Sequence, residues 1–213
     1  MANDNKSLTK TIEDVSVDNM EIVLDRLTDN FLTGDIGKIV IDLPLIKNVG
    51  AFISILGSVK NYFFLKKLDD FLNQLKLGPV DKEKYRNLSK NYGEYRVLEN
   101  IILHIDMMKE QKQTVVYSYL FKALLNEKLS WDDFESLAFS LEHFSPRHLI
   151  EPVIIDPKKG NQIVKGPTST FINAGLATIM GPMWGGDVIL ANDLGVKFWE
   201  YGLCPFQKHN KLS

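Results

Sequence analysis

Residues 38–65 form the most apolar stretch of the chain and read KIVIDLPLIKNVGAFISILGSVKNYFFL. Pro44 suits the first turn of a helix, because its missing N–H would have no partner at that position anyway. After it, only Gly50 and Gly57 weaken a helix that runs to Leu65. The stretch therefore predicts a long apolar helix, and the rest of the fold is organised around it.

One face of this helix carries small residues at positions i, i+4, i+7 and i+8. Small residues let a second helix approach closely, as they do in pairs of membrane helices. The charge-free window covers residues 48–59, which is shorter than the roughly 20 residues that cross a bilayer. Two interpretations stay open: a core helix of a soluble bundle, or a segment that meets a membrane after assembly. The candidate membrane or oligomer contact consists of Gly50, Phe52, Ile53, Ser54, Leu56, Gly57 and Ser58.

Length and composition limit the possible classes of protein. A chain of 213 residues with 45% hydrophobic and 24% charged residues can bury a core in one large or two small domains. The net charge of −2 implies no bulk attraction to nucleic acid or to anionic lipid. Cys204 is the one cysteine, which excludes an internal disulfide and favours a reducing compartment. No secretory signal is visible, so we expect a cytoplasmic protein that moves to the inner face of the cell membrane if activation releases the apolar segment.

The first part of the chain divides into a loose N-terminus, residues 1–17, and an α-helical body, residues 18–145, which contains the apolar segment 39–65. The first 37 residues hold eight acidic and three basic side chains, a net charge of −5. This excess is either a solvated helix face or an acidic cover that keeps the apolar segment in water. Further helices are predicted at the ranges 81–91, 94–109, 114–126 and 130–144, the last opened by a capping box of Ser130 and Asp133. The inward face expected for 94–109 consists of Val97, Leu98, Ile101, Ile102, Ile105 and Met108, and that for 130–144 of Phe134, Leu137, Ala138 and Leu141.

The predicted secondary structure changes at residue 146 from helices alone to a mixture of helices and strands. Helical spacing over 168–176, two β-prone runs around a glycine-rich turn in 177–190, and a cap at Asn192 or Asp193 predict a helix, a hairpin and a second helix. The phrases NAGLA from Asn173 and LANDLGVKFWEY from Leu190 resemble the corresponding part of a winged-helix domain. The expected fold class is therefore mainly α: a helical bundle followed by a small α+β winged-helix-like C-terminal domain, residues 146–203, and a tail, residues 204–213.

DNA binding is not expected of this module. Residues 166–196 contain no Lys or Arg, although they include the helix and the wing that would contact a duplex. Neutralising phosphates requires several basic side chains. A neutral apolar wing instead suits a protein partner, and the candidate partner-binding residues are Met180, Met183 and Trp184. The alternative is that these three side chains pack on the chain's own helices.

No group of residues with a catalytic or metal-binding spacing is visible. The four histidines lack any spacing that places two ligands on one helix face, and Cys204 has no activating neighbour in the sequence. The glycine-rich run GPMWGG from Gly181 does not lead into a phosphate-binding helix. We therefore expect neither an enzyme nor a cofactor.

Two longer runs resemble known sequences. LPLIK from Leu43 with GSVKNYFFLKKLDDFL from Gly57, and LFKALLNEKLSWDDF from Leu120, resemble a set of uncharacterised bacterial helical proteins. The layout of bundle plus winged helix is similar to abortive-infection alpha-type proteins of bacterial phage defence. The resemblance implies a role in phage defence and assigns no functional residue. Together with the apolar helix and its face of small residues, it leads us to expect a non-enzymatic effector that assembles as a homo-oligomer, is triggered by a protein partner such as a phage component, and permeabilises the membrane through residues 39–65. The alternative is a soluble protein-interaction or regulatory module, and a nucleic-acid-binding regulator is a third, weaker hypothesis.

Overall fold

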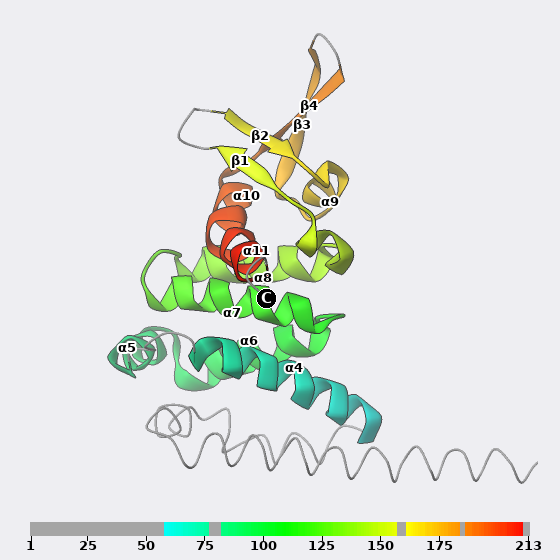
Figure 1. Cartoon of the computed structure of the whole chain (residues 1–213). Coiled ribbons are helices and arrows are strands. Elements are labelled where there is room, and N and C mark those ends of the chain that lie inside the picture. Colours follow the sequence, from blue (N-terminus) through cyan, green and yellow to red (C-terminus); the bar gives the residue numbers. More distant parts are fainter. Residues whose placement is uncertain (1–57, 77–81, 157–160, 184–185, 211–213) are drawn as a thin grey trace, which may run out of the picture. The chain divides into compact units, whose positions relative to one another are not determined.

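The computed structural model describes residues 58–76, 82–156, 161–183 and 186–210 (Figure 1). It divides into two compact units, residues 1–106 and 107–213. The described chain is mainly helical, and its C-terminal part carries one four-stranded antiparallel sheet. This confirms the expected class of a helical bundle with a small α+β C-terminal domain. Most of the apolar segment, up to residue 57, lies outside the described residues.

The first unit contains α4 (Ser58–Lys76), α5 (Lys82–Tyr92) and α6 (Glu94–Met107). The C-terminal end of the apolar segment forms the first turns of α4, where Phe64 and Leu65 are buried. The helical period continues along α4, and its buried apolar side chains are Phe64, Leu65, Leu68, Phe71, Leu72 and Leu75. Of the side chains described in segment 39–65, Phe64 and Leu65 are part of the core and Phe63 is 60% exposed.

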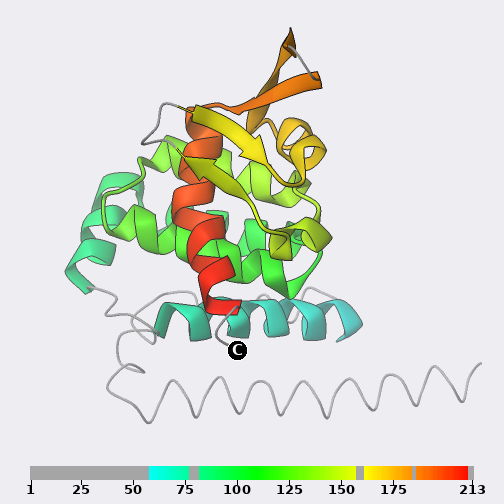
Figure 2. The same cartoon turned by 45° about the horizontal axis from the view of Figure 1, so that its top comes forward.

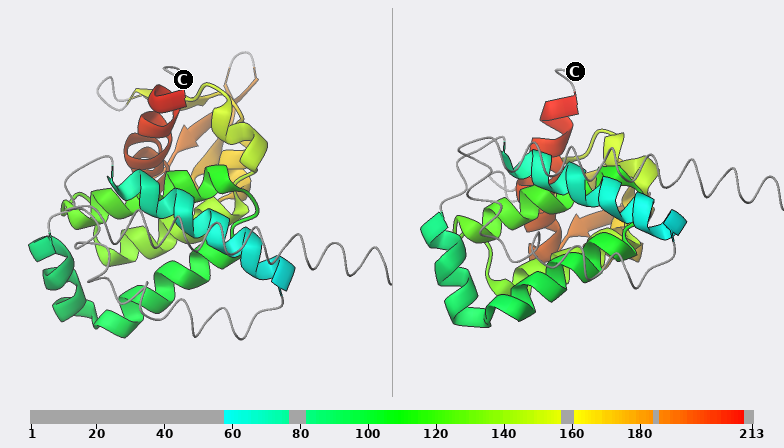
Figure 3. Two further views of the ribbon diagram at one scale, coloured as in Figure 1. Left: turned by 60° about the horizontal axis from the view of Figure 1, so that its bottom comes forward. Right: turned by 90° about the horizontal axis from the view of Figure 1, so that it is seen from below.

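A sharp turn at Gly93 joins α5 to α6 (Figure 3). Gly93 has a φ of +86°, a conformation that costs a residue with a Cβ strain energy. Its N–H donates to the carbonyl of Ser89 at 2.9 Å, which closes α5. The predicted inward face of α6 is confirmed as buried from Val97 to Ile105. The half-buried Nζ of Lys67 on α4 donates to the carbonyl of Asp106 at 2.8 Å, so α4 contacts the C-terminal end of α6.

The second unit begins with α7 (Gln111–Leu125) and α8 (Trp131–His143), joined by a short loop. The predicted capping box is present, because the Oγ of Ser130 accepts from the N–H of Asp133 and the carboxylate of Asp133 accepts from the N–H of Ser130. Tyr117 stacks on Phe134 with ring centroids 5.2 Å apart. Burial and the neighbouring carboxylates of Glu142 and Glu135 raise the pKa of Tyr117 well above its usual range.

The sheet consists of β1 (Ile154–Asp156), β2 (Asn161–Lys165), β3 (Ala177–Met183) and β4 (Gly186–Ala191), in the order β1-β2-β4-β3. The one-turn helix η1 (Pro146–Ile150) precedes it, and α9 (Thr168–Asn173) lies between β2 and β3. The predicted hairpin is present as β3 and β4, which extend beyond the helices of this unit (Figures 1 and 2). Strand β2 was not predicted, since its sequence NQIVK has too few apolar residues to show a period.

One continuous helix closes the chain (Figure 2). It consists of α10 (Asp193–Phe198), a π-helical turn η3 (Trp199–Leu203) and α11 (Cys204–Asn210), so it continues into the stretch assigned to a tail. The predicted cap is Asn192, whose side chain accepts from the N–H of Gly195 at 2.8 Å. The indole of Trp199 donates to the carbonyl of Val153 at 3.0 Å, which fixes this helix to the segment before β1.

The two compact units meet at residues 106/107. The sequence instead placed the domain boundary at 145/146, where the local composition changes. An aromatic cluster explains the difference, because Phe144 at the end of α8 contacts both Phe171 of α9 and Phe198 of α10 at 5.3 Å between ring centroids. All three rings are fully buried. Helices α7 and α8 therefore supply the core against which the C-terminal elements fold, although composition groups them with the preceding helices.

Candidate functional site

An apolar surface covers one face of the sheet. Cross-strand partners point to the same face, as do residues two apart on one strand. The side chains of the following pairs therefore lie on one face: Ile163 with Leu190, Met180 with Val188, and Ile154 with Lys165. We call this surface the outer sheet face and define it by Ile154, Ile163, Met180, Val188 and Leu190.

The opposite face of the sheet is the packed one. Five of its residues are buried, as expected for side chains that alternate with the outer face, and they are Ile155, Val164, Ala177, Ile189 and Ala191. Ile179, which pairs with Ile189 on the same face, is 56% exposed on the edge strand. Antiparallel sheets with one packed face usually carry polar residues on the other. Here the outer sheet face is mainly apolar instead, with Ile154 58% exposed and Met180 49% exposed. Thr178 and Lys165 are polar residues that the same pairings place on it. This departure from the usual alternation marks the face as a candidate contact surface.

Strand β3 forms one edge of the sheet. Among the described strands it pairs with β4 alone, so every second N–H and C=O group of β3 points away from the sheet. Thr178, Ile179 and Met180 are all exposed along this edge. The edge can therefore accept a further strand next to the outer sheet face.

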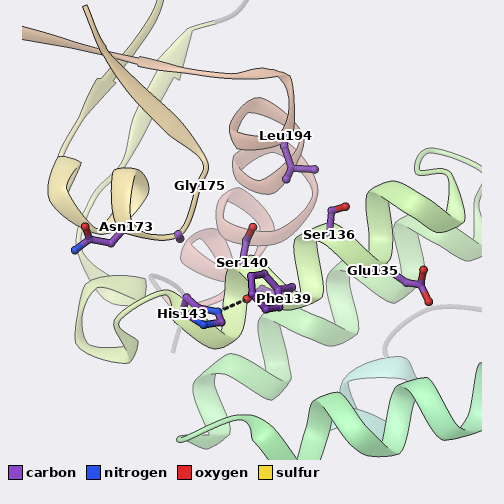
Figure 4. Close-up of a pocket in the computed structure, with 9 residues that line it drawn as sticks. Glu135, Ser136, Phe139, Ser140, His143, Asn173, Gly175 and Leu194 are labelled. Carbon is purple, nitrogen blue, oxygen red and sulfur yellow. Dashed lines mark hydrogen bonds between the residues drawn. The ribbon is translucent and has the colours of Figure 1, made fainter.

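A separate pocket of about 620 Å³ opens between α8, the end of α9 and the start of α10 (Figure 4). Its α8 side presents residues at i, i+1, i+4, i+5 and i+8, which share one helix face. The other side comes from the turn after α9 and from α10. The lining residues are Glu135, Ser136, Phe139, Ser140, His143, Asn173, Ala174, Gly175 and Leu194.

An exposed aromatic ring lies in the middle of the α8 side. Phe139 is 59% exposed and its ring centroid lies 4.4 Å from that of His143, one turn further along the helix. The Nδ1 of His143 donates to the carbonyl of Phe139 at 2.9 Å, which holds the imidazole beside the phenyl ring (Figure 4). Glu135 precedes Phe139 by one turn, so a carboxylate, a phenyl ring and an imidazole follow one another along α8.

Hydrogen bonds fix the opposite wall of the pocket. Gly175 adopts a φ of +71° and ends α9, and its carbonyl accepts from the Nδ2 of Asn192 at 2.8 Å. The N–H of Asn192 donates to the carbonyl of Leu176 at 3.1 Å. Gly195 lies so close to that carbonyl that an added Cβ would be 1.9 Å from its oxygen. The turn after α9 and the start of α10 are therefore held together as one wall.

The pocket has a mainly apolar lining with a few polar side chains and one carboxylate. Its polar side chains include the carboxylate of Glu135, two hydroxyls and the amide of Asn173, and none of its lining residues is Lys or Arg. Nearby, Lys197 of α10 is engaged elsewhere, because its Nζ lies 2.7 Å from Oδ2 of Asp133. The pocket therefore favours a positively charged group over an anion.

The sequence-predicted contact set of the apolar segment is largely outside the described residues. Gly50, Phe52, Ile53, Ser54, Leu56 and Gly57 all lie there. Ser58 is the first residue of α4, and its side chain is not described. The packing of protomers through this small-residue face stays a prediction.

Two of the three residues assigned to a protein partner lie on β3. Met180 lies on the outer sheet face, Met183 is the last residue of β3, and Trp184 lies outside the described residues. The pocket was not predicted. Its signal in the sequence was Phe139, an aromatic residue outside the predicted inward face of its helix.

Two searches of the described residues gave negative results. None of their helices combines the length and the apolar character needed to cross a membrane. No group of three or more His, Cys, Asp or Glu side chains among them could hold a metal ion. Comparison of the chain with models of protein families, with curated proteins and with solved structures found no match.

Proposed function

We propose that this protein is a protein-interaction module whose C-terminal unit binds a partner polypeptide through the outer sheet face. The observation that carries the proposal is the exposure of Ile154 and Met180 on the face opposite the packed core. Full burial of an exposed Ile or Met side chain contributes about 1.5–3 kcal/mol. A partner that covers this face therefore gains free energy from contacts that the isolated chain lacks.

The open edge of β3 specifies how the partner binds. An extended segment that pairs with β3 would form backbone hydrogen bonds with the edge and place alternate side chains on the outer sheet face. Apolar side chains suit this face, since Lys165 is the one charged residue in the pairings that define it. The partner is accordingly an extended polypeptide with alternating apolar residues.

Site-specific crosslinking in cells tests this function. A photo-reactive amino acid replaces Met180 in the full chain, and the control carries the same amino acid at Ile150, which is 56% exposed on η1, away from the sheet. We expect an adduct at position 180 whose partner peptide is apolar at alternate positions, with Met180→Lys abolishing binding of that peptide. Equal adducts at both positions would overturn the proposal. An adduct with a second copy of this chain would show that the outer sheet face mediates self-association and not the binding of another protein.

A second candidate function is membrane engagement through residues 39–65, with the phage-defence setting that the sequence resemblance implies. The observation that favours it is Phe63 on α4, which is 60% exposed between Lys60 and Lys66. Aromatic and basic residues at this spacing suit an interfacial helix. Release of the segment would expose Phe64 and Leu65, which costs about 3–6 kcal/mol for the two side chains, so a trigger is required.

Dye leakage from anionic vesicles, with the full chain and with Phe63→Glu, tests the second candidate. Leu103→Glu is the matched control, because Leu103 is an exposed apolar residue of α6 in the same unit. Leakage that Phe63→Glu abolishes and Leu103→Glu preserves would support membrane engagement, and expression under phage challenge would then test defence. Vesicles that stay intact under every condition would contradict it.

A further inference from the structure

We propose that the pocket between α8, α9 and α10 binds an organic cation, with a guanidinium group as the best fit. This site is distinct from the outer sheet face and takes a different class of ligand. The inference starts from the order of side chains along α8: Glu135, Phe139 and His143 each lie one turn apart on the face that lines the pocket. At 1.5 Å per residue the row is about 12 Å long, enough for a side chain or a small linear cation.

The phenyl ring of Phe139 supplies the first contact. An aromatic face attracts a cation within about 6 Å of its centroid, and a planar guanidinium also stacks on it. More than half of this side chain is exposed to the pocket side of α8, although core positions of the same helix are fully buried. The imidazole of His143 is held against one side of the ring by its hydrogen bond to the carbonyl of Phe139.

The carboxylate of Glu135 supplies the second contact. Glu135 lies one helical turn from Phe139 on the face of α8 that lines the pocket, the spacing at which two side chains of a helix can contact one ligand. Ser136 and Ser140 add hydroxyl groups on the same face, and Asn173 lines the opposite side. Several acceptors in different directions suit a guanidinium, which presents five N–H donors in one plane.

The charge of the surrounding chain supplies an independent argument. Residues 166–196 form the wall opposite α8 and the hairpin beyond it, and they contain Asp187 and Asp193 but no Lys or Arg. No basic side chain of this wall can therefore occupy the pocket or repel a cation. The basic residue that follows, Lys197, points to Asp133 and forms an ion pair with it.

Binding of capped arginine to the full chain, followed by NMR, tests the proposal. The probe is N-acetyl-arginine amide, and the matched control ligand is N-acetyl-citrulline amide, which has the same shape without the charge. We expect a dissociation constant on the order of 1 mM for arginine, with shifts confined to α8, the turn after α9 and the start of α10, and binding of citrulline weaker by about tenfold. Equal binding of the two probes, or shifts elsewhere only, would overturn the proposal.

Two substitutions assign the contacts. Glu135→Gln removes the charge at constant shape and Phe139→Leu removes the ring, and each should weaken arginine binding by about fivefold or more. Glu127→Gln is the control, because Glu127 is an exposed acidic residue in the loop before α8, outside the pocket. An equal loss in the control would contradict the assignment. Unchanged circular dichroism in all three variants verifies that they fold.

The source of the cation is tested in the same titration. One arm uses agmatine as a free small cation, and the other uses a Gly-Ser-Arg-Ser-Gly peptide. Tighter binding of the peptide assigns the pocket to an arginine of a protein partner, whereas tighter binding of agmatine assigns it to a free metabolite cation. Binding of neither probe would overturn the proposal.

Discussion

The side chain of Gln113 donates a hydrogen bond from Nε2 to the carbonyl of Leu141 at 2.7 Å in a fully buried position. The same nitrogen lies 3.3 Å from the carbonyl of Phe144, and Oε1 accepts from the N–H groups of Lys109 and Glu110 at 2.8 and 3.2 Å. A single amide thus satisfies free backbone groups at the start of α7 and at the end of α8. This contact fixes the pair of helices on which the sheet and the pocket are built.

Replacement of Gln113 by Leu should lower the free energy of unfolding by about 2–4 kcal/mol, because it removes a fully buried amide that pairs with the carbonyls of Leu141 and Phe144 and with the N–H groups of Lys109 and Glu110. Urea denaturation of the full chain measures the change. Gln111→Leu serves as the control, since Gln111 is a half-buried residue in the first turn of the same helix. A similar loss in both variants would show that the hydrogen bonds of Gln113 are not the cause.

Two buried glycines of the C-terminal helix should respond differently to Ala. At Gly195 an added Cβ would lie 1.9 Å from the carbonyl oxygen of Leu176, a backbone atom that cannot move alone. At Gly202 it would lie 3.1 Å from a methyl group of Val116, a side chain that can adjust. We expect Gly195→Ala to destabilise the chain by about 3 kcal/mol or more and Gly202→Ala by about 1 kcal/mol or less, since Ala improves helix propensity at both sites. Thermal unfolding of the two variants checks the order, and the reverse order would contradict it.

Local patterns predicted the individual elements of this fold. The apolar period of α6, the capping box of Ser130 and Asp133, and the cap at Asn192 are short-range signals, and the structure confirms each of them. The hairpin of β3 and β4 follows from a glycine-rich turn between two β-prone runs. These features depend on residues within a few positions of one another. Patterns over such short distances can be recognised in a single sequence.

The relationships between distant residues were not predicted. The cluster of Phe144, Phe171 and Phe198 joins three elements whose spacing in sequence carries no period. It moves α7 and α8 into the C-terminal unit, against the change in composition at residue 146. The pocket depends on the same tertiary arrangement, since α8 and the turn after α9 meet there. The sequence alone shows that Phe139 is an aromatic residue outside the inward face of its helix. It does not show which residues form the opposite wall of the pocket.

Acidic pH should stabilise the first unit through Asp70. Burial, together with repulsion from Asp69, raises the pKa of the Asp70 carboxyl to about 6, and Lys66 offsets part of this rise. Since this pKa exceeds the model-peptide value of 3.8, the ionised form destabilises the folded state at neutral pH, and stability rises as the pH falls from about 6 towards 4.

Asp70→Asn should therefore raise the free energy of unfolding at pH 7 by about 1 kcal/mol, a value reduced for the solvent access of this half-buried group. Urea denaturation at pH 7 and pH 5 measures the effect, and the gain should shrink at the lower pH. Glu99→Gln on the exposed side of α6 is the control. A gain that is the same at both pH values would contradict the assignment to Asp70.

The ion pair of Asp133 and Lys197 has the opposite pH dependence. The hydrogen bond from Lys197, together with those involving Ser130, lowers the pKa of Asp133 below its usual value. A carboxylate with a lowered pKa stabilises the folded state above its unfolded pKa, near pH 4, and this contribution is lost as the pH falls through the folded pKa. Because both side chains are partly exposed, we expect Lys197→Met to cost about 1 kcal/mol or less at pH 7.

Urea denaturation of Lys197→Met, Asp133→Asn and the double variant, at pH 7 and near pH 3, isolates the pair from the cap. Asp133→Asn alone should cost more than Lys197→Met, because it also removes a negative charge from the first turn of α8, where the helix dipole favours one. The coupling energy of the double-mutant cycle should be positive at pH 7 and vanish near pH 3. A coupling that persists at the lower pH would show that packing between the two side chains, and not the ion pair, accounts for their interaction.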